Sequence, residues 1–241
     1  MIVARDESDP DGALPRPAPG GSQRVAAFFD VDHTLLDVNS GSKWLRHAWL
    51  TGKVRPLRAV QALVWLVRYR LALLDLEAVT ALAAEDYRGS SAADLDAEVR
   101  SWFRRDIEAH VTAEGRERVA WHRAQGHVVA LLTSGTRFSA TPLAELLDAP
   151  YLLCTELEVE AGKLTGRHIA PACAGPGKVV HAERFAAAHG VDLARSYFYT
   201  DSFSDLPMLE RVGRPVVVNP DPRLRRHARV RGWEVERWRA A

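Results

Sequence analysis

Short apolar runs, each followed by polar residues, recur along the chain and predict the strands of a β-sheet. The first run, VAAFF at residues 25–29, is continuously apolar over the length of a strand, which is typical of a strand buried on both faces. Further strands are expected at residues 128–132, 151–154, 196–200 and 215–219. Residues 156–169 alternate around Ala161-Gly162-Lys163, a pattern that predicts a β-hairpin.

Helical patterns separate these strands. Helices are expected at residues 112–125, at about 138–147, and from about residue 178 to the residue before Gly190. Residues 223–231 are basic, and we interpret them as the solvated surface of a further helix. Strands that alternate with helices imply a parallel sheet with right-handed crossovers. The pattern therefore predicts an α/β fold with a central parallel sheet flanked by helices.

A stretch without any β pattern follows the first strand. Helices are expected within it at residues 43–50, 56–75, 76–88 and 92–110. We therefore predict an all-helical domain over 39–111, inserted into a core formed by 24–38 and 112–241. The helix over 56–75 is very apolar, but Arg58, Arg68 and Arg70 make it too charged for a membrane span. It is either a buried bundle helix or an apolar surface for a greasy substrate or a partner.

Composition limits the classes of function. The 241 residues are 47% hydrophobic and 26% charged, which suits a globular protein with a sizeable core. A net charge of +1 indicates no general attraction to nucleic acid or to membranes. Residues 1–23 are rich in Pro, Gly and acids and are expected to be a disordered leader without a secretory signal. With only Cys154 and Cys173 there is no disulfide framework, so a cytoplasmic location is expected.

Candidate chemistry begins directly after the first strand, at Asp30 and Asp32. Two residues apart in nearly extended chain, their carboxylates point the same way and share a small volume at the carboxyl end of the strand. Like charges at that separation need a cation or a shared proton. Taken alone, the pair is equally compatible with ordinary turn chemistry.

Two further groups suit an anion. Thr133, Ser134 and Gly135 lie between a strand and a helix, where hydroxyls, close backbone approach and free N–H groups can bind an oxyanion. The alternative is a simple helix cap. Lys178 opens a helix, where its charge opposes the helix dipole, and lysine is scarce in this arginine-rich chain. Its position indicates a nearby anion, with a solvated surface lysine as the alternative.

Asp201 and Asp205 follow the strand at 196–200 and complete the set. Clustered oxygen donors suit Mg²⁺, which takes one or two carboxylates together with water and substrate phosphate. A capped helix start at Ser204 or Asp205 is the alternative reading. In a parallel sheet, all four groups of residues are expected at one edge.

The segments FFDVDHTLL, LLTSGT, GPGK and YTDSFSDLPML resemble the four ordered motifs of the haloacid dehalogenase (HAD) superfamily of phosphohydrolases. The position of the helical insert and the ending VVVNPDPRLRRHARVRGW resemble its phosphoserine-phosphatase-like branch, subfamily IB. The similarity extends over residues 25–238. It implies a Rossmann-like HAD core with an all-helical cap over 39–111, and hydrolysis of a phosphomonoester.

The resemblance also implies roles for individual residues. Asp30 would attack phosphorus to form an aspartyl-phosphate, and Asp32 would protonate the leaving oxygen and later deprotonate water. Thr133 matches the hydroxyl that binds the phosphoryl oxygen, with Ser134 as a neighbouring candidate and Gly135 beside them. The residue chemistry agrees, because covalent catalysis divides hydrolysis into two in-line steps that reuse one acid–base group.

The resemblance places Mg²⁺ between Asp201, the Asp30 carboxylate and the Asp32 backbone carbonyl, with Asp205 supporting the metal from further out or through water. Lys178 would steady both nucleophile and phosphate. This cationic neutralisation is what lets a carboxylate approach a phosphate dianion.

Substrate choice belongs to the helical insert. Phosphoserine phosphatases carry a glutamate nine residues after the nucleophile, and this chain has Asn39 there. We therefore expect another small phosphomonoester rather than phosphoserine: histidinol phosphate, another amino-alcohol phosphate or a lipid-derived phosphate. A phosphotransferase or mutase, or a catalytically silent binding module, are the rival functions. The sequence predicts neither a nucleic-acid partner nor stable membrane insertion, and leaves the oligomeric state open.

Overall fold

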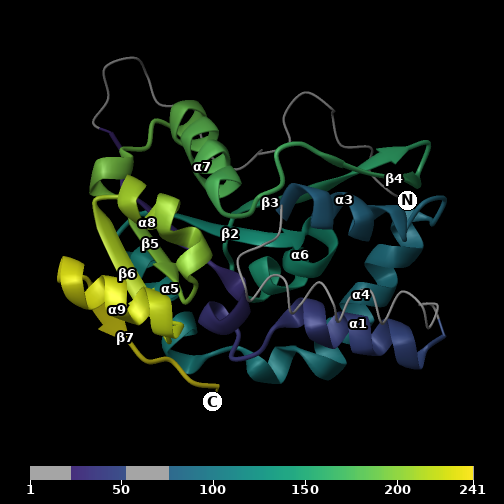
Figure 1. Cartoon of the computed structure of the whole chain (residues 1–241), viewed down its shortest axis with the longest axis horizontal. Coiled ribbons are helices and arrows are strands. Elements are labelled where there is room, and N and C mark those ends of the chain that lie inside the picture. The colour runs from purple at the N-terminus through teal and green to yellow at the C-terminus, as the bar shows by residue number, and fades with distance from the viewer. Residues whose placement is uncertain (1–22, 53–75, 241) are drawn as a thin grey trace.

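A computed structural model of the chain describes residues 23–52 and 76–240. Residues 1–22 of the predicted leader and the predicted helix over 56–75 lie outside the described residues. Within the described part, the order of elements alternates strands and helices, as Figure 1 shows. None of the described helices is long and apolar enough to cross a membrane.

One seven-stranded sheet organises the core, in the order β4-β3-β2-β1-β5-β6-β7. Its strands are β1 (Ala26–Phe29), β2 (Val128–Thr136), β3 (Tyr151–Glu160), β4 (Lys163–Ile169), β5 (Tyr197–Thr200), β6 (Arg214–Val218) and β7 (Glu234–Glu236). Only the β3–β4 pair is antiparallel; the remaining described strand pairs run parallel. The predicted α/β fold with a central parallel sheet is confirmed.

The strand β1 lies in the middle of the sheet, between β2 and β5, and is buried on both faces. Ala27 and Phe29 pack into one apolar cluster, whereas Ala26 and Phe28 pack into another on the opposite face. Side chains of a strand alternate between faces, so a continuous apolar run is needed when both faces are covered. Phe29 also stacks on Tyr199 of β5, with ring centroids 4.6 Å apart.

Helices cover both faces of the sheet. The cluster containing Phe29 is closed by α5 (Ala113–Ala124) and α6 (Arg137–Leu146). The cluster containing Phe28 is closed by α7 (Pro176–His189), α8 (Leu206–Arg211) and α9 (Pro222–Arg231). Short helical turns η1 (Val31–Leu35), η2 (Glu108–His110), η3 (Leu193–Arg195) and η4 (Phe203–Asp205) complete the described elements.

The described parts of residues 39–111 contain helices as their regular elements: α1 (Ser40–Leu50), α3 (Leu76–Glu85), α4 (Ala92–Asp106) and the turn η2. They gather at the end of the molecule that carries β4, away from α8 and α9 (Figure 1). Backbone hydrogen bonds from Gly89 to Leu164 and from Ala92 to Gly162 join this stretch to the β3–β4 hairpin. The helical character agrees with the sequence pattern, and the boundaries of a separate domain stay a prediction.

Several boundaries differ from the sequence predictions for physical reasons. The strand β3 continues to Glu160 because it forms the first arm of the predicted hairpin, whose turn has positive φ at Ala161 and Gly162. The strand β2 continues to Thr136, which caps α6, so α6 begins at Arg137 rather than residue 138. The strand β7, residues EVE, is absent from the predictions, because three residues give too short a pattern.

A buried histidine of helix α5, His122, forms a hydrogen bond with Tyr199 of β5 that depends on pH. The ring of His122 is fully buried in α5; its Nε2 lies 2.8 Å from the Tyr199 hydroxyl and its Nδ1 2.8 Å from Nδ1 of His127. Burial, reinforced by the charges of His127 and Arg118, lowers the pKa of His122 to about 3. The folded protein therefore holds this ring neutral.

We predict that acid destabilises the fold through His122. Its folded pKa lies below its unfolded value, so its contribution is present above pH 6.5 and is lost as pH falls toward about 3. The loss amounts to at most about 1.4 kcal/mol per pH unit. In urea unfolding series between pH 7 and pH 4, His122→Gln should show a shallower decline than the wild type, and the control His181→Gln should not. Identical slopes for wild type and His122→Gln would contradict this.

Candidate active site

Asp30 stands at the carboxyl end of the central strand β1. Its backbone N–H donates to the Tyr199 carbonyl at 2.9 Å, which continues the pairing of β1 with β5, and the residue is 7% exposed. The chain then reverses at His33, whose φ is +57°. The turn η1, which contains His33, follows β1 directly and leaves Asp30 at the carboxyl end of the strand.

Lys178 is a buried ammonium between two carboxylates. Its Nζ donates to Oδ1 of Asp30 at 2.7 Å and to Oδ2 of Asp205 at 2.6 Å, while the Thr200 hydroxyl donates to the same Asp205 oxygen at 2.7 Å. Only 2% of Lys178 is exposed. Burial alone would lower the pKa of Lys178, but the charges of Asp205 and Asp30 raise it above its usual value, so the ammonium stays charged.

Tight packing fixes the position of helix α7, which carries Lys178 in its first turn. Helix α7 starts at Pro176, after Gly175 with φ of +50°. A Cβ added to Gly177 would lie 1.9 Å from the Ala172 carbonyl oxygen, so any side chain there would push α7 away from its neighbour. Lys178 therefore stands in the first helical turn, as predicted from its position, with its side chain turned inward to the carboxylates rather than to solvent.

Both oxygens of Asp32 accept hydrogen bonds. Asn39 donates through Nδ2 to Oδ2 at 3.0 Å, and the Ser40 backbone N–H donates to Oδ1 at 2.9 Å. Burial raises the pKa of Asp32, and the hydrogen bond from Ser40 opposes that rise. Asn39 in turn accepts from the Ser42 N–H through Oδ1 and caps α1. The start of the helical insert thus orients this carboxylate.

Thr133, Ser134 and Gly135 follow Leu131 and Leu132 of β2, at the same edge of the sheet as Asp30, because Leu131 pairs with Phe29. Thr133 is buried, and its hydroxyl oxygen accepts from the Gly135 N–H at 3.1 Å. That bond leaves the hydroxyl proton available to a ligand. Ser134 is exposed, and its carbonyl accepts from Thr155. These residues make no hydrogen bond to Asp30 or Lys178 within the described structure.

Negative charge exceeds positive charge around Asp201. Burial, together with the charges of Asp30 and Asp205, raises the pKa of Asp201 to about 9. Burial also raises the pKa of Asp30 to about 7, although Lys178 pulls in the opposite direction. One ammonium therefore does not neutralise this group of carboxylates, and the surplus favours a further cation.

The donor set fits Mg²⁺. The residues that could hold it are the Asp30 and Asp201 carboxylates with the Asp32 carbonyl, which leaves positions for water and phosphate, as this ion prefers. The described residues contain no group of three or more His, Cys, Asp or Glu side chains that could hold a metal, so a full protein cage is not what this site offers. Asp205 commits Oδ2 to Lys178 and Thr200, in keeping with a supporting position.

The sequence analysis missed Thr200 and Asp221, and it considered Asn39 only as a substrate-contacting position, not as a partner of Asp32. Thr200 fixes Asp205, and Asn39 holds Asp32. Asp221 accepts from the Phe203 N–H at 2.6 Å and donates its own N–H to the Asp201 carbonyl at 2.9 Å, so it shapes the loop that carries Asp201. Asp221 precedes Pro222 at the start of α9, and an acidic residue before a helical proline is a cap signal that could have identified it.

Comparisons with known proteins agree with this geometry. The family model for haloacid dehalogenase-like hydrolases matches residues 27–210. A phosphoserine phosphatase of Mycobacterium tuberculosis is 32% identical over 98% of this chain and 81% of its own length. A histidinol-phosphatase of Neisseria meningitidis is 29% identical over 87% of this chain and 96% of its own.

A solved structure extends the similarity to three dimensions. A protein of unknown function from Bordetella pertussis is 33% identical, with a TM-score of 0.82 over 89% of this chain and 99% of its own. The family match covers most of the chain and includes the strand ends that carry Asp30, Thr133 and Asp201. The chain therefore belongs to the haloacid dehalogenase-like hydrolase family, and within that family it is a phosphatase.

Proposed function

We propose that this phosphatase is a Mg²⁺-dependent hydrolase of small phosphomonoesters that transfers the phosphoryl group to Asp30 and then to water. The observation that carries the proposal is the buried ammonium of Lys178, 2.7 Å from the Asp30 carboxylate at the end of the central strand. It opposes the rise in the pKa of Asp30 that burial causes, and it leaves positive charge beside the incoming phosphate.

In the first step, an Asp30 oxygen attacks phosphorus and the ester bond to the leaving oxygen breaks. Asp32 supplies the proton to that oxygen, because burial raises the pKa of its carboxyl group and so favours the protonated form, while Asn39 and Ser40 orient it. In the second step, Asp32 takes a proton from water, which attacks the aspartyl-phosphate and releases inorganic phosphate. Asp30 is thereby regenerated.

The phosphoryl oxygens need donors, and Thr133 is the better placed of the two neighbouring hydroxyls. Its oxygen already accepts from Gly135, which aims the free proton away from the backbone, whereas Ser134 is exposed and makes no described side-chain bond. Lys178 would add positive charge beside the same phosphoryl group. When bound, Mg²⁺ at Asp30, Asp201 and the Asp32 carbonyl would offset the negative charge that accumulates in the transition state.

The surroundings of Asp32 bear on the substrate. Asn39 occupies the position nine residues after Asp30, and both ends of its amide are engaged, with Asp32 and with Ser42. As a neutral amide it offers no positive charge to a substrate carboxylate. A substrate carboxylate would add negative charge to a site that is already acidic. We therefore place an amino-alcohol phosphate, such as histidinol phosphate, ahead of phosphoserine; relatives named for each of the two substrates are similar to this chain.

Asp30→Asn should lower phosphate release from a generic aryl phosphate with Mg²⁺ by at least about a thousandfold, because the variant has no nucleophile. The fold should remain intact, since the amide can still accept from Lys178. The matched control is Asp148→Asn, which removes an exposed carboxylate paired with Arg123, and its rate should stay within about twofold of wild type. Near-normal turnover by Asp30→Asn would overturn the assignment of the nucleophile.

Removal of Mg²⁺ by a chelator should abolish turnover, and excess Mg²⁺ should restore it. Because the ion also relieves the crowded carboxylates, Mg²⁺ should raise the thermal unfolding temperature of the wild type. It should not raise that of a variant combining Asp30→Asn with Asp201→Asn. A rate that is unchanged after chelation, or an equal thermal shift in the double variant, would count against metal binding at these residues.

Phosphoethanolamine and phosphoserine differ only by a carboxylate, so they test the substrate class directly. We expect kcat/KM for phosphoethanolamine and for histidinol phosphate to exceed that for phosphoserine by at least about tenfold, equivalent to about 1.4 kcal/mol of transition-state stabilisation. Phosphate release measured for the three compounds under one Mg²⁺ concentration gives the ratios. A preference for phosphoserine would refute the substrate assignment and leave the roles of Asp30 and Mg²⁺ untouched.

A further inference from the structure

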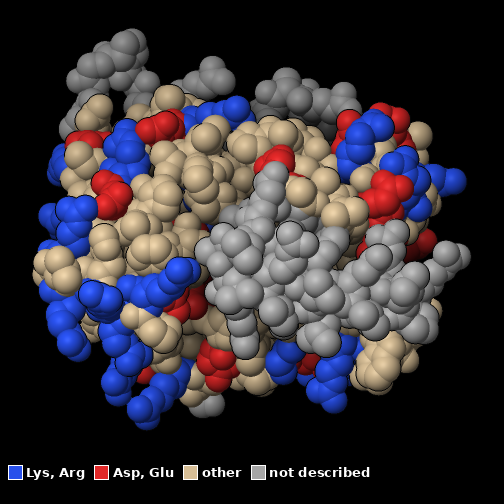
Figure 2. All heavy atoms as spheres, in the orientation of Figure 1, with Lys and Arg blue, Asp and Glu red and all other residues tan. Residues whose placement is uncertain are grey.

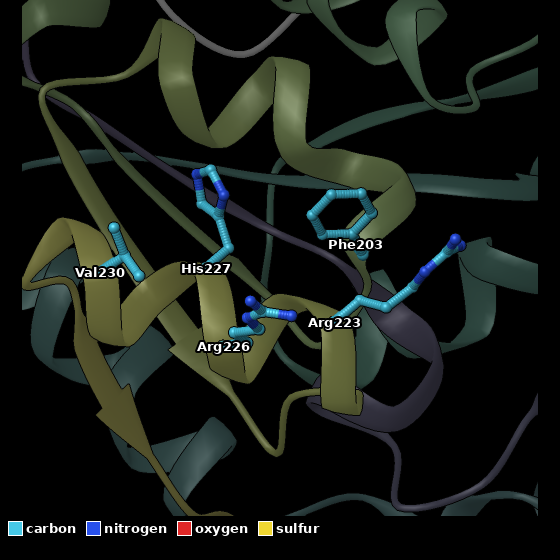
Figure 3. Close-up of a pocket in the computed structure, with 5 residues that line it drawn as sticks. All are labelled: Phe203, Arg223, Arg226, His227 and Val230. Carbon is cyan, nitrogen blue, oxygen red and sulfur yellow. The ribbon is translucent and has the colours of Figure 1, made fainter.

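Helix α9 has two faces with different environments. Leu224 and Ala228 are fully buried and pack against the core. On another side, residues 223, 226, 227 and 230 follow one another at helical spacing and face Phe203 of the η4 turn. Together these five side chains line a pocket of about 360 Å³, shown in Figure 3; the lining residues are Phe203, Arg223, Arg226, His227 and Val230.

Two cations of this pocket have no anionic partner among the described residues. Within the part of the chain that the structure describes, no ion pair or side-chain hydrogen bond involves the guanidinium of Arg223 or Arg226. By contrast, Arg231 of the same helix pairs with Glu210 at 2.6 Å, and Arg225 donates to the Pro220 carbonyl. Figure 2 shows Lys and Arg side chains gathered over the region of α9. The pocket therefore carries a local positive charge although the chain is nearly neutral.

The pocket also has an aromatic wall and an unsatisfied polar atom. The Arg223 guanidinium lies 5.8 Å from the centre of the Phe203 ring, and the His227 ring packs between Phe203 and Trp233, at 6.0 and 5.2 Å. The Nε2 atom of His227 is buried and has no hydrogen-bond partner among the described residues. Val230 is 80% exposed at the rim. A buried polar atom without a partner costs stability unless a ligand satisfies it.

We propose that this pocket is a second binding site, for a small anion that carries an aromatic ring. Guanidinium groups bind phosphate and carboxylate through paired N–H donors, and a flat ring can stack on Phe203 beside them. The volume lies within the usual range for small-molecule sites, roughly 300–1,000 Å³. The lining contains none of the residues assigned to phosphoryl transfer, so the site does not depend on the proposed function.

Hydrogen bonds connect this pocket to the catalytic loop. The backbone of Phe203 is held by Asp221, which also holds the Asp201 carbonyl. A ligand against the Phe203 ring would thus touch the segment that positions a metal-binding carboxylate. Binding at this pocket could therefore affect the position of Asp201, although the pocket lies outside the candidate active site.

The test uses the full-length wild-type protein labelled with 5-fluorotryptophan, because Trp233 packs against His227 and reports on the pocket. Comparison with Trp233→Phe assigns its ¹⁹F resonance. Phenylphosphonate, which the enzyme cannot hydrolyse, should shift this resonance saturably. Methylphosphonate should bind about fivefold more weakly, since it lacks the ring contact. Benzoate distinguishes a carboxylate ligand from a phosphoryl one: a saturable shift extends the site to carboxylates, and its absence restricts the site to phosphoryl anions.

Two double variants with the same change of charge provide the matched comparison. Arg223→Gln with Arg226→Gln should weaken phenylphosphonate binding at Trp233 by at least about tenfold. Arg225→Gln with Arg229→Gln, on the same helix but outside the lining, should leave it within about twofold. Unchanged ¹⁹F spectra without ligand verify that both variants fold.

Three results would overturn the proposal. The first is a Trp233 resonance that does not shift at saturating phenylphosphonate. The second is equal weakening in the two double variants, which would show diffuse attraction to a basic surface. The third is a response limited to other tryptophans, such as Trp44 of α1, which would place the ligand elsewhere.

Discussion

The contact on which the site depends is a buried ammonium shared by two carboxylates. Moving one charge out of water costs several kcal/mol, and the Lys178 ammonium recovers that cost only because Asp30 and Asp205 both accept from it at short distance. The same contact fixes three elements with respect to one another: the end of β1, the first turn of α7 and the loop after β5. The arrangement of the candidate site is thereby built into the packing of the core.

The surrounding structure makes that contact unavoidable. The strand β1 is buried on both faces, so Asp30 cannot turn away from the sheet edge without exposing Phe28 or Phe29. Gly177 lets α7 approach the Ala172 carbonyl closely enough for Lys178 to reach inward. Even so, burial and the neighbouring carboxylates raise the pKa values of Asp30 and Asp201, so a further cation would relieve the group, as the proposed function requires.

Local patterns in the sequence were sufficient for the fold class and for the positions of the candidate residues, because buried strands and helix starts leave signals over a few residues. These local patterns could not show which side chains form contacts between distant parts of the chain. The position of Lys178 indicates a nearby anion, but it does not identify Asp205 as a partner. Nor does any local pattern show that Thr200 and Asp221 hold the loop after β5, since these contacts depend on the folded chain. Short elements such as β7 were likewise beyond reach, because three residues define no period.

The most direct test of the account is to identify the covalent intermediate. Wild-type protein should be quenched with acid during turnover of an aryl phosphate with Mg²⁺, digested and analysed by mass spectrometry. The account predicts one phosphoryl group on the peptide that contains Asp30, and none on that peptide in Asp30→Asn. A phosphoryl group found on another residue, or none in a protein that is turning over substrate, would contradict it.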